Sequence, residues 1–244
     1  MSAALRFYTG TMIERLRPLP SPDSLRLIAF DLDGTLIDSR ADLVASVNAT
    51  LAHLGRHALP DAVIASYIGD GVQMLVRRAL GDPQHEKTVT AAVTFFLSYY
   101  RLHKLDHTYV YDGVLESLSA IARALPQARL AVLTNKPIRP SEEICAALRL
   151  APHCFRIYGG NSFETKKPDP LGLETLMREA GATPEQTLMI GDSDVDVLTA
   201  RNAGASVVGC RFGLAPHSLA DAPPDCLVDA PSEWLEAIGI PQNV

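Results

Sequence analysis

The chain has 244 residues, of which 47% are hydrophobic and 20% charged, a composition typical of a globular protein rather than a disordered one. Its 22 Lys and Arg against 28 Asp and Glu give a formal net charge of −6, which argues against a nucleic-acid binder that depends on clustered basic residues. No run approaches the roughly 20 apolar residues of a membrane span, and the N-terminus lacks a signal-peptide core, so we expect a cytoplasmic protein with no membrane partner.

The N-terminal segment has no clear secondary-structure signal. Residues 1–24 show weak hydrophobic periodicity and three prolines between Pro18 and Pro22. We therefore predict a loose N-terminal extension over residues 1–24. Translation from Met12 is as compatible with the sequence as translation from Met1.

Short apolar runs bounded by turn residues recur along the rest of the chain. The first is Leu25–Phe30, and the others are Arg129–Leu133, Phe155–Tyr158, Thr187–Ile190 and Ala205–Gly209. Continuous apolar runs of this length are typical of strands that are buried on both faces of a parallel sheet. Helical periodicity lies between them, over residues 113–124, 171–180 and 195–203. The alternation predicts an α/β fold with a doubly wound, mainly parallel, Rossmann-like sheet.

One segment interrupts this alternation. Residues 40–107 contain several apolar stripes at helical spacing and no convincing strand. We predict that they form a helical cap domain inserted into an α/β core, which comprises residues 25–39 and 108–244.

Polar residues follow the predicted strands. Asp31 and Asp33 follow the first, Thr134 and Asn135 the second, and Asp192 the fourth, while Lys166 and Lys167 lie in the loop after the third. Because ligands bind outside the carboxyl ends of strands in open α/β sheets, we expect these groups to converge. Closely spaced carboxylates repel unless a cation intervenes, and oxygen ligands suit Mg²⁺. The alternative is structural: Asp192 or Ser193 caps a helix and Asp33-Gly34 forms a turn.

Taken together, four motifs resemble those of the haloacid dehalogenase-like phosphohydrolases. They are Asp31-Leu32-Asp33-Gly34-Thr35-Leu36, Thr134-Asn135, Lys167-Pro168-x-Pro170 and Gly191-Asp192-x3-Asp196. The resemblance covers residues 26 to about 238, and the helical insert is similar to that family's type-1 cap. It implies a Mg²⁺-dependent phosphatase that hydrolyses a small phosphorylated metabolite.

The resemblance also implies a role for each motif residue. Asp31 would be the nucleophile that forms an aspartyl-phosphate, and Asp33 the general acid and base. Mg²⁺ would be held by Asp31, the Asp33 main-chain carbonyl and Asp192. Phosphoryl oxygens would be bound by Thr134, Asn135 and Lys167. We expect Asp196 to orient Lys167 or a metal-bound water, and Lys166 to be a solvated loop lysine.

Within the family, the chain is most similar to the bacterial phosphoglycolate phosphatases. The similarity rests on Tyr67-Ile68-Gly69-Asp70-Gly71, Met74-Leu75-x3-Ala79-Leu80, Leu133-Thr134-Asn135-Lys136-Pro137 and Gly159-Gly160. It implies 2-phosphoglycolate as substrate and a cap that closes as a lid. The residues that would select the substrate are Tyr67, Gly69, Asp70, Gly71, Arg77 and Arg78, and either arginine could pair with a substrate carboxylate.

Other functions are compatible with the same scaffold. A sugar-phosphate phosphatase or a phosphosugar mutase would use the same motifs, and a non-enzymatic phospho-acceptor module would also present an acidic strand end. The helical insert and the presence of Asp33 two residues after Asp31 argue against the phospho-acceptor. We expect a monomer or homodimer.

Overall fold

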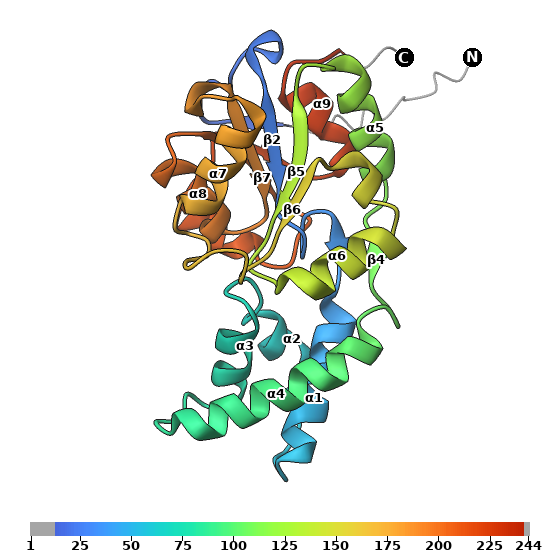
Figure 1. Cartoon of the computed structure of the whole chain (residues 1–244), viewed down its shortest axis with the longest axis vertical. Coiled ribbons are helices and arrows are strands. Elements are labelled where there is room, and N and C mark those ends of the chain that lie inside the picture. Colours follow the sequence, from blue (N-terminus) through green and yellow to red (C-terminus); the bar gives the residue numbers. More distant parts are fainter. Residues whose placement is uncertain (1–12, 242–244) are drawn as a thin grey trace, which may run out of the picture.

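The computed structural model describes residues 13–241, so the choice between Met1 and Met12 lies outside the described residues. The main sheet has seven strands in the order β1-β9-β8-β7-β2-β5-β6, of which β7, β2, β5 and β6 are labelled in Figure 1, and a second sheet pairs β3 with β4. The strands are β1 Glu14–Arg15, β2 Leu27–Phe30, β3 Ile37–Asp38, β4 Tyr109–Val110, β5 Arg129–Leu133, β6 Arg156–Tyr158, β7 Thr187–Gly191, β8 Ser206–Cys210 and β9 Cys226–Val228.

The centre of the main sheet is parallel, which confirms the predicted fold class. Strand β2 lies between β5 and β7, with Phe30 opposite Val132 on one side and Ile190 on the other. All four residues of β2 are buried, because both faces of the sheet are covered. The strand ends that carry the predicted polar motifs therefore lie side by side.

One edge of the sheet corrects the prediction of a loose N-terminal extension. Within it, Glu14 and Arg15 form β1, which pairs antiparallel with β9. The Arg15 guanidinium donates hydrogen bonds to the main-chain oxygens of Glu236 and Ala237. Residues 13–24 therefore belong to the α/β core, and residues 1–12 lie outside the described part of the chain.

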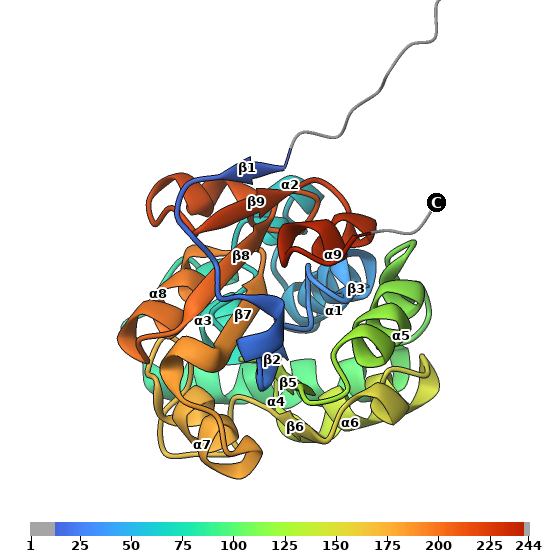
Figure 2. The same cartoon turned by 90° about the horizontal axis from the view of Figure 1, so that it is seen from above.

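Helices cover both faces of the sheet. Helices α7 and α8 lie on one face, and α5, α6 and α9 lie on the other (Figure 2). The second face includes the buried Trp234, whose ring centroid is 5.3 Å from that of Phe30. These helices are α5 Val114–Ala124, α6 Ile138–Ala147, α7 Leu171–Ala180, α8 Asp194–Asn202 and α9 Trp234–Ala237. Short 3-10 helices occur at Pro22–Ser24, Ala151–His153, Pro184–Gln186, Pro216–Ala220 and Pro231–Glu233.

Four helices form the insert at the carboxyl ends of the strands (Figure 1). They are α1 Arg40–His53, α2 Asp61–Ala65, α3 Val72–Ala79 and α4 Glu86–His103. Their apolar faces bury a separate core that includes Val47, Leu51 and Phe96. We call α1–α4 with their connecting loops the cap. Within residues 13–241, no helix is long and apolar enough to cross a membrane.

The cap joins the core through two adjacent connections. Strands β3 and β4 pair antiparallel where the chain leaves and re-enters the core. Next to them, the buried Asp42 carboxylate at the start of α1 accepts hydrogen bonds from the main-chain N–H groups of His107 and Thr108 and from the Thr108 hydroxyl. The two connections are therefore held together at the base of the cap.

Candidate active site

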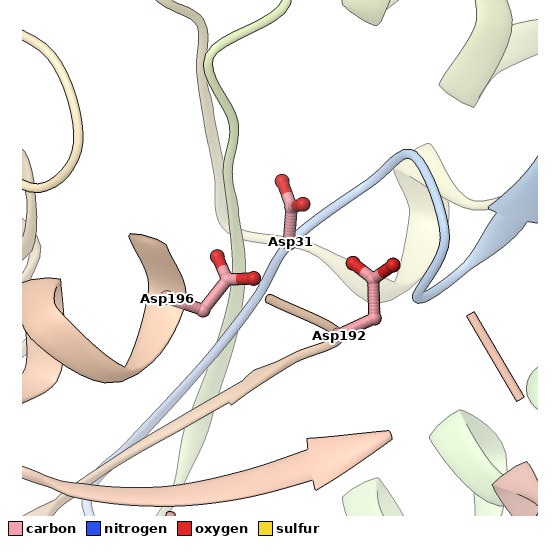
Figure 3. Close-up of side chains that lie close together, drawn as sticks. All are labelled: Asp31, Asp192 and Asp196. Carbon is pink, nitrogen blue, oxygen red and sulfur yellow. The ribbon is translucent and has the colours of Figure 1, made fainter. Parts of the chain in front are cut away.

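Three buried carboxylates meet at the carboxyl ends of the central strands. Asp31 directly follows β2, Asp192 directly follows β7, and Asp196 lies in the first turn of α8. One ligand oxygen from each lies within 4.8 Å of the others, and Figure 3 shows the three side chains around one small region. Parallel pairing of β2 with β7 produces this juxtaposition, since Phe30 and Ile190 are register partners.

A single lysine is shared by two of these carboxylates. The Lys167 Nζ atom lies 2.8 Å from Asp31 Oδ1 and 2.6 Å from Asp196 Oδ1. The other oxygen of Asp196 accepts hydrogen bonds from the main-chain N–H and the hydroxyl of Ser193. Asp196 is thus occupied on both oxygens, and it orients the lysine that touches Asp31.

Burial and charge shift the pKa values of this cluster. Burial raises the pKa of Asp31 to about 6, although Lys167 acts in the opposite direction. Burial, reinforced by Asp196 and Asp31, raises the pKa of Asp192 well above its usual range. Burial alone would lower the pKa of Lys167, but the Asp196 and Asp31 carboxylates outweigh it and hold that pKa above its usual range.

Asp192 is enclosed by closely packed backbone. Its Oδ2 accepts hydrogen bonds from the main-chain N–H groups of Leu214 and Ala215, at 2.7 and 3.0 Å. A Cβ atom on Gly34 would lie 2.2 Å from the same oxygen, and Gly34 has a φ of +91°. Glycine is required there for both reasons. The remaining oxygen, Oδ1, lies 3.5 Å from the Thr35 hydroxyl.

The donor set fits a hard divalent cation. Asp31 and Asp192 present carboxylate oxygens on adjacent strand ends, and Lys167 lies within ion-pair distance of Asp31 and Asp196 but not of Asp192. The cluster therefore holds more negative charge than the protein neutralises. A Mg²⁺ ion, which prefers a few carboxylates with phosphate or water oxygens, suits such a site.

Thr134 and Asn135 follow β5 and lie beside the carboxylates. Both are buried, and the Thr134 hydroxyl accepts a hydrogen bond from the main-chain N–H of Lys136. The Asn135 amide donates to the main-chain oxygens of Lys167 in the core and Gly69 in the cap. The Oδ1 atom of Asn135 is buried and has no hydrogen-bond partner among residues 13–241.

Asp33 faces a lysine that our site prediction omitted. The Lys136 Nζ atom lies 2.9 and 3.0 Å from the two oxygens of Asp33, and the Ser39 hydroxyl donates to Asp33 Oδ1. The Lys136 side chain is 4% exposed. The sequence signal was present in Thr134-Asn135-Lys136-Pro137, but nothing local distinguishes this lysine from a surface lysine.

A cavity of about 40 Å³ lies between the core and the cap. Asp33, Thr134, Asn135 and Lys136 line it from the core, and Tyr100 lines it from α4. The remaining cap lining is apolar or glycine and includes Leu43, Ile68, Gly69, Gly71, Val72 and Phe96. Among the described lining residues, Lys136 is the only cation.

The predicted selectivity residues divide into two groups. Gly69 and Gly71 line the cavity, whereas Tyr67, Asp70, Arg77 and Arg78 do not. Arg77 forms ion pairs with Asp82 and Glu86, and Arg78 pairs with Asp70 and donates to the Tyr67 main-chain oxygen. No contact in the described structure supports a role for either arginine at the cavity.

Lys166 is exposed, as expected for a loop lysine, but it also contacts the cap. Its ammonium donates to the main-chain oxygen of Asp70. Together with the bond from Asn135 to Gly69, this contact holds the loop between α2 and α3 against the core.

Comparisons with known proteins agree with this geometry. Residues 28–210 match the family described as haloacid dehalogenase-like hydrolase. The phosphoglycolate phosphatase of Chromobacterium violaceum is 39% identical over 80% of this chain and 88% of its own, and that of Vibrio cholerae is 34% identical over 88% and 97%. The crystal structure of a predicted phosphoglycolate phosphatase from Haemophilus somnus superposes with a TM-score of 0.81 at 30% identity, covering 88% and 98% of the two chains. The chain therefore belongs to the haloacid dehalogenase-like hydrolases, as a phosphatase similar to these relatives.

Proposed function

We propose that this phosphatase hydrolyses small phosphate monoesters, 2-phosphoglycolate first among them, through an aspartyl-phosphate on Asp31 and with Mg²⁺ as cofactor. The observation that carries the proposal is the Lys167 ammonium between Asp31 and Asp196, beside the further carboxylate of Asp192. This arrangement combines a nucleophile, a cation for the phosphoryl group and an oxygen-rich metal site.

The chemistry proceeds in two displacements. An Asp31 carboxylate oxygen attacks phosphorus while the bond to the leaving alkoxide breaks, and the alkoxide takes a proton from Asp33. Water then attacks the aspartyl-phosphate, gives its proton to Asp33 and releases inorganic phosphate with Asp31 restored. Asp33 lines the cavity, which supports its role as the acid and base for the leaving group.

The remaining motif residues bind the phosphoryl group. Lys167 offsets its negative charge, and the Thr134 hydroxyl and the Asn135 main-chain N–H bind its non-bridging oxygens, because the Asn135 side-chain amide already donates to Gly69 and Lys167. Asp31 and Asp192 would hold the Mg²⁺ ion with the Asp33 main-chain oxygen, and a bound Mg²⁺ supplies positive charge that offsets that of the incoming phosphate. Asp196 keeps the lysine in position through its 2.6 Å ion pair.

Two features support a small leaving group that carries a carboxylate. The cavity of about 40 Å³ is roughly three times the space that one water molecule needs, which favours a glycolate over a hexose. Curated relatives at 34–39% identity are named phosphoglycolate phosphatases.

The cap serves as the lid of this site. Gly71 has a φ of +82°, and a Cβ atom there would lie 2.9 Å from the main-chain oxygen of Asn135. The absence of a side chain lets the cap loop close on the core, where it shelters the reacting groups from bulk water.

A phosphate-release screen with Mg²⁺ tests the proposal. It compares 2-phosphoglycolate with hexose phosphates, nucleoside monophosphates and pyrophosphate, without a bisphosphate activator. Preferred release from phosphoglycolate is the expected result. Equal turnover of hexose phosphates would contradict the substrate, activator-dependent isomerisation would indicate a mutase, and a long-lived phosphoenzyme without turnover would indicate a phospho-acceptor. The cytoplasmic location and the monomeric or homodimeric state stay predictions.

A further inference from the structure

The cavity between the core and the cap contains a buried cation, Lys136. Lys136 is held by three neighbours: both oxygens of Asp33, at 2.9 and 3.0 Å, and the ring of Tyr100, whose centroid lies 4.7 Å from Nζ. Residue Lys136 is 6% exposed and Tyr100 is 3% exposed. An ammonium in such a site is positioned by the fold and is shielded from solvent.

A second polar group of the cavity, the Tyr100 hydroxyl, lies near the Lys136 ammonium. The Tyr100 hydroxyl is buried and makes no hydrogen bond of normal geometry within the described structure. Buried hydroxyl groups without partners are rare in folded proteins, and leaving one unsatisfied costs stability. The cap residues that line the cavity with Tyr100, including Val72, Leu75 and Phe96, offer no polar atom from their side chains.

The two groups together form a recognition site for an anionic end of the substrate. We propose that Lys136 and Tyr100 determine specificity by binding the carboxylate of the leaving group. Lys136 releases the Asp33 carboxylate when it binds that of the substrate. This inference rests on the proposed function. One carboxylate oxygen forms an ion pair with the Lys136 ammonium, and the other accepts a hydrogen bond from the Tyr100 hydroxyl, so both buried groups are satisfied.

The same site disfavours other phosphate esters. The hydroxyl groups of a neutral sugar gain no charge-assisted bond to Lys136 and need more room than about 40 Å³ provides. Arg77 and Arg78 pair with acidic residues of the cap instead, which leaves the ammonium from the core as the group that meets the substrate. Specificity therefore comes from Lys136 in the core and from Tyr100 in α4.

The test compares two substrates that differ only at this end. 2-Phosphoglycolate carries a carboxylate where 2-hydroxyethyl phosphate carries a neutral hydroxymethyl group. Lys136→Met keeps the length of the side chain and removes its charge, and Tyr100→Phe removes only the hydroxyl. Lys87→Met, an exposed lysine of α4, makes the same change of charge as a matched control.

We expect selective losses. Lys136→Met should lower kcat/KM for phosphoglycolate about 10- to 100-fold while changing that for hydroxyethyl phosphate far less, because one charge-assisted bond is lost. Tyr100→Phe should lower kcat/KM for phosphoglycolate about 3- to 10-fold, mainly by raising KM, as expected for the loss of one neutral hydrogen bond. Lys87→Met should leave both values unchanged.

Two outcomes would overturn the inference, and each differs from a failure of the proposed function. Equal losses on both substrates in Lys136→Met would show that the lysine acts only through Asp33. An unchanged preference in both variants would show that the carboxylate binds elsewhere. If the unmodified protein releases phosphate equally from both substrates, the proposed substrate fails first. Tyr100→Phe, which retains the ion pair with Asp33, keeps the test valid if Lys136→Met does not fold.

Discussion

Asp192→Asn isolates the charge repulsion at the candidate metal site. The asparagine keeps the shape of the side chain and an oxygen for the N–H groups of Leu214 and Ala215. What it removes is one negative charge from a cluster in which ligand oxygens lie within 4.8 Å of one another. We expect the variant to lose phosphatase activity and its response to Mg²⁺, while the metal-free protein gains stability.

The size of that gain follows from the cluster. Asp192 faces two carboxylates, Asp31 and Asp196, and one cation, Lys167, so it experiences roughly one net negative charge. At about 5 Å and an effective dielectric constant of ~20, the repulsion is about 3 kcal/mol. For a protein of this size, removing this repulsion would raise the Tm of Asp192→Asn by at most roughly 6–12 °C.

The pH dependence has a definite sign. The folded-state pKa of Asp192 is raised above its usual value of 3.8, so the native state holds this proton more tightly than the unfolded chain does. Stability is therefore lost as the pH rises from about 4 through the raised pKa. The stabilising effect of Asp192→Asn should be largest at neutral pH or above and should disappear near pH 4.

Thermal unfolding in chelator and in a Mg²⁺ titration measures these effects. The unmodified protein should gain stability with Mg²⁺, by about 2.7 kcal/mol at a hundredfold excess over Kd, whereas Asp192→Asn should not. Asp194→Asn, which makes the same change of charge two residues away, is the control. A lower Tm for Asp192→Asn in chelator, together with an intact Mg²⁺ response, would refute the reasoning.

Three further predictions test other parts of the site. Asp31→Asn should abolish turnover of every substrate, whereas Asp33→Asn should accumulate phosphoenzyme with p-nitrophenyl phosphate, because that leaving group needs little protonation. Mass spectrometry after rapid quench locates the phosphate, and phosphate on a residue other than Asp31 would contradict the assignment. Gly71→Ala should cost about 1–3 kcal/mol in the closed cap, because the backbone conformation of Gly71 (φ +82°, ψ +168°) is almost confined to glycine. It should raise KM about tenfold, and an unchanged KM would refute closure of the cap over the substrate. Arg77→Ala and Arg78→Ala should each leave KM for phosphoglycolate within about twofold, because both arginines pair with acidic residues of the cap and neither lines the cavity. A selective increase in KM would restore the arginines as carboxylate ligands.

Local patterns in the sequence were sufficient for the fold class and for most of its elements. The run Arg129–Leu133 predicted β5 to the residue, and the periodicity of residues 171–180 predicted α7. Such signals are local, since an apolar run or a helical stripe records only which side of an element is buried. Short elements without a period, including β1, β3, β4 and β9, were not predicted, because two or three residues carry no pattern.

The candidate site was predicted as a set of strand ends, since the carboxyl ends of parallel strands meet at one edge of the sheet. Which side chains touch there was decided only by the tertiary structure. Lys136 and Lys166 are both lysines beside a motif. Lys136 is buried against Asp33, whereas Lys166 is exposed and contacts the Asp70 main-chain oxygen of the cap. Arg77 faces Glu86 rather than the cavity. Burial and pairing of this kind depend on segments about 10 to 100 residues apart in the chain, whose contacts no local pattern records.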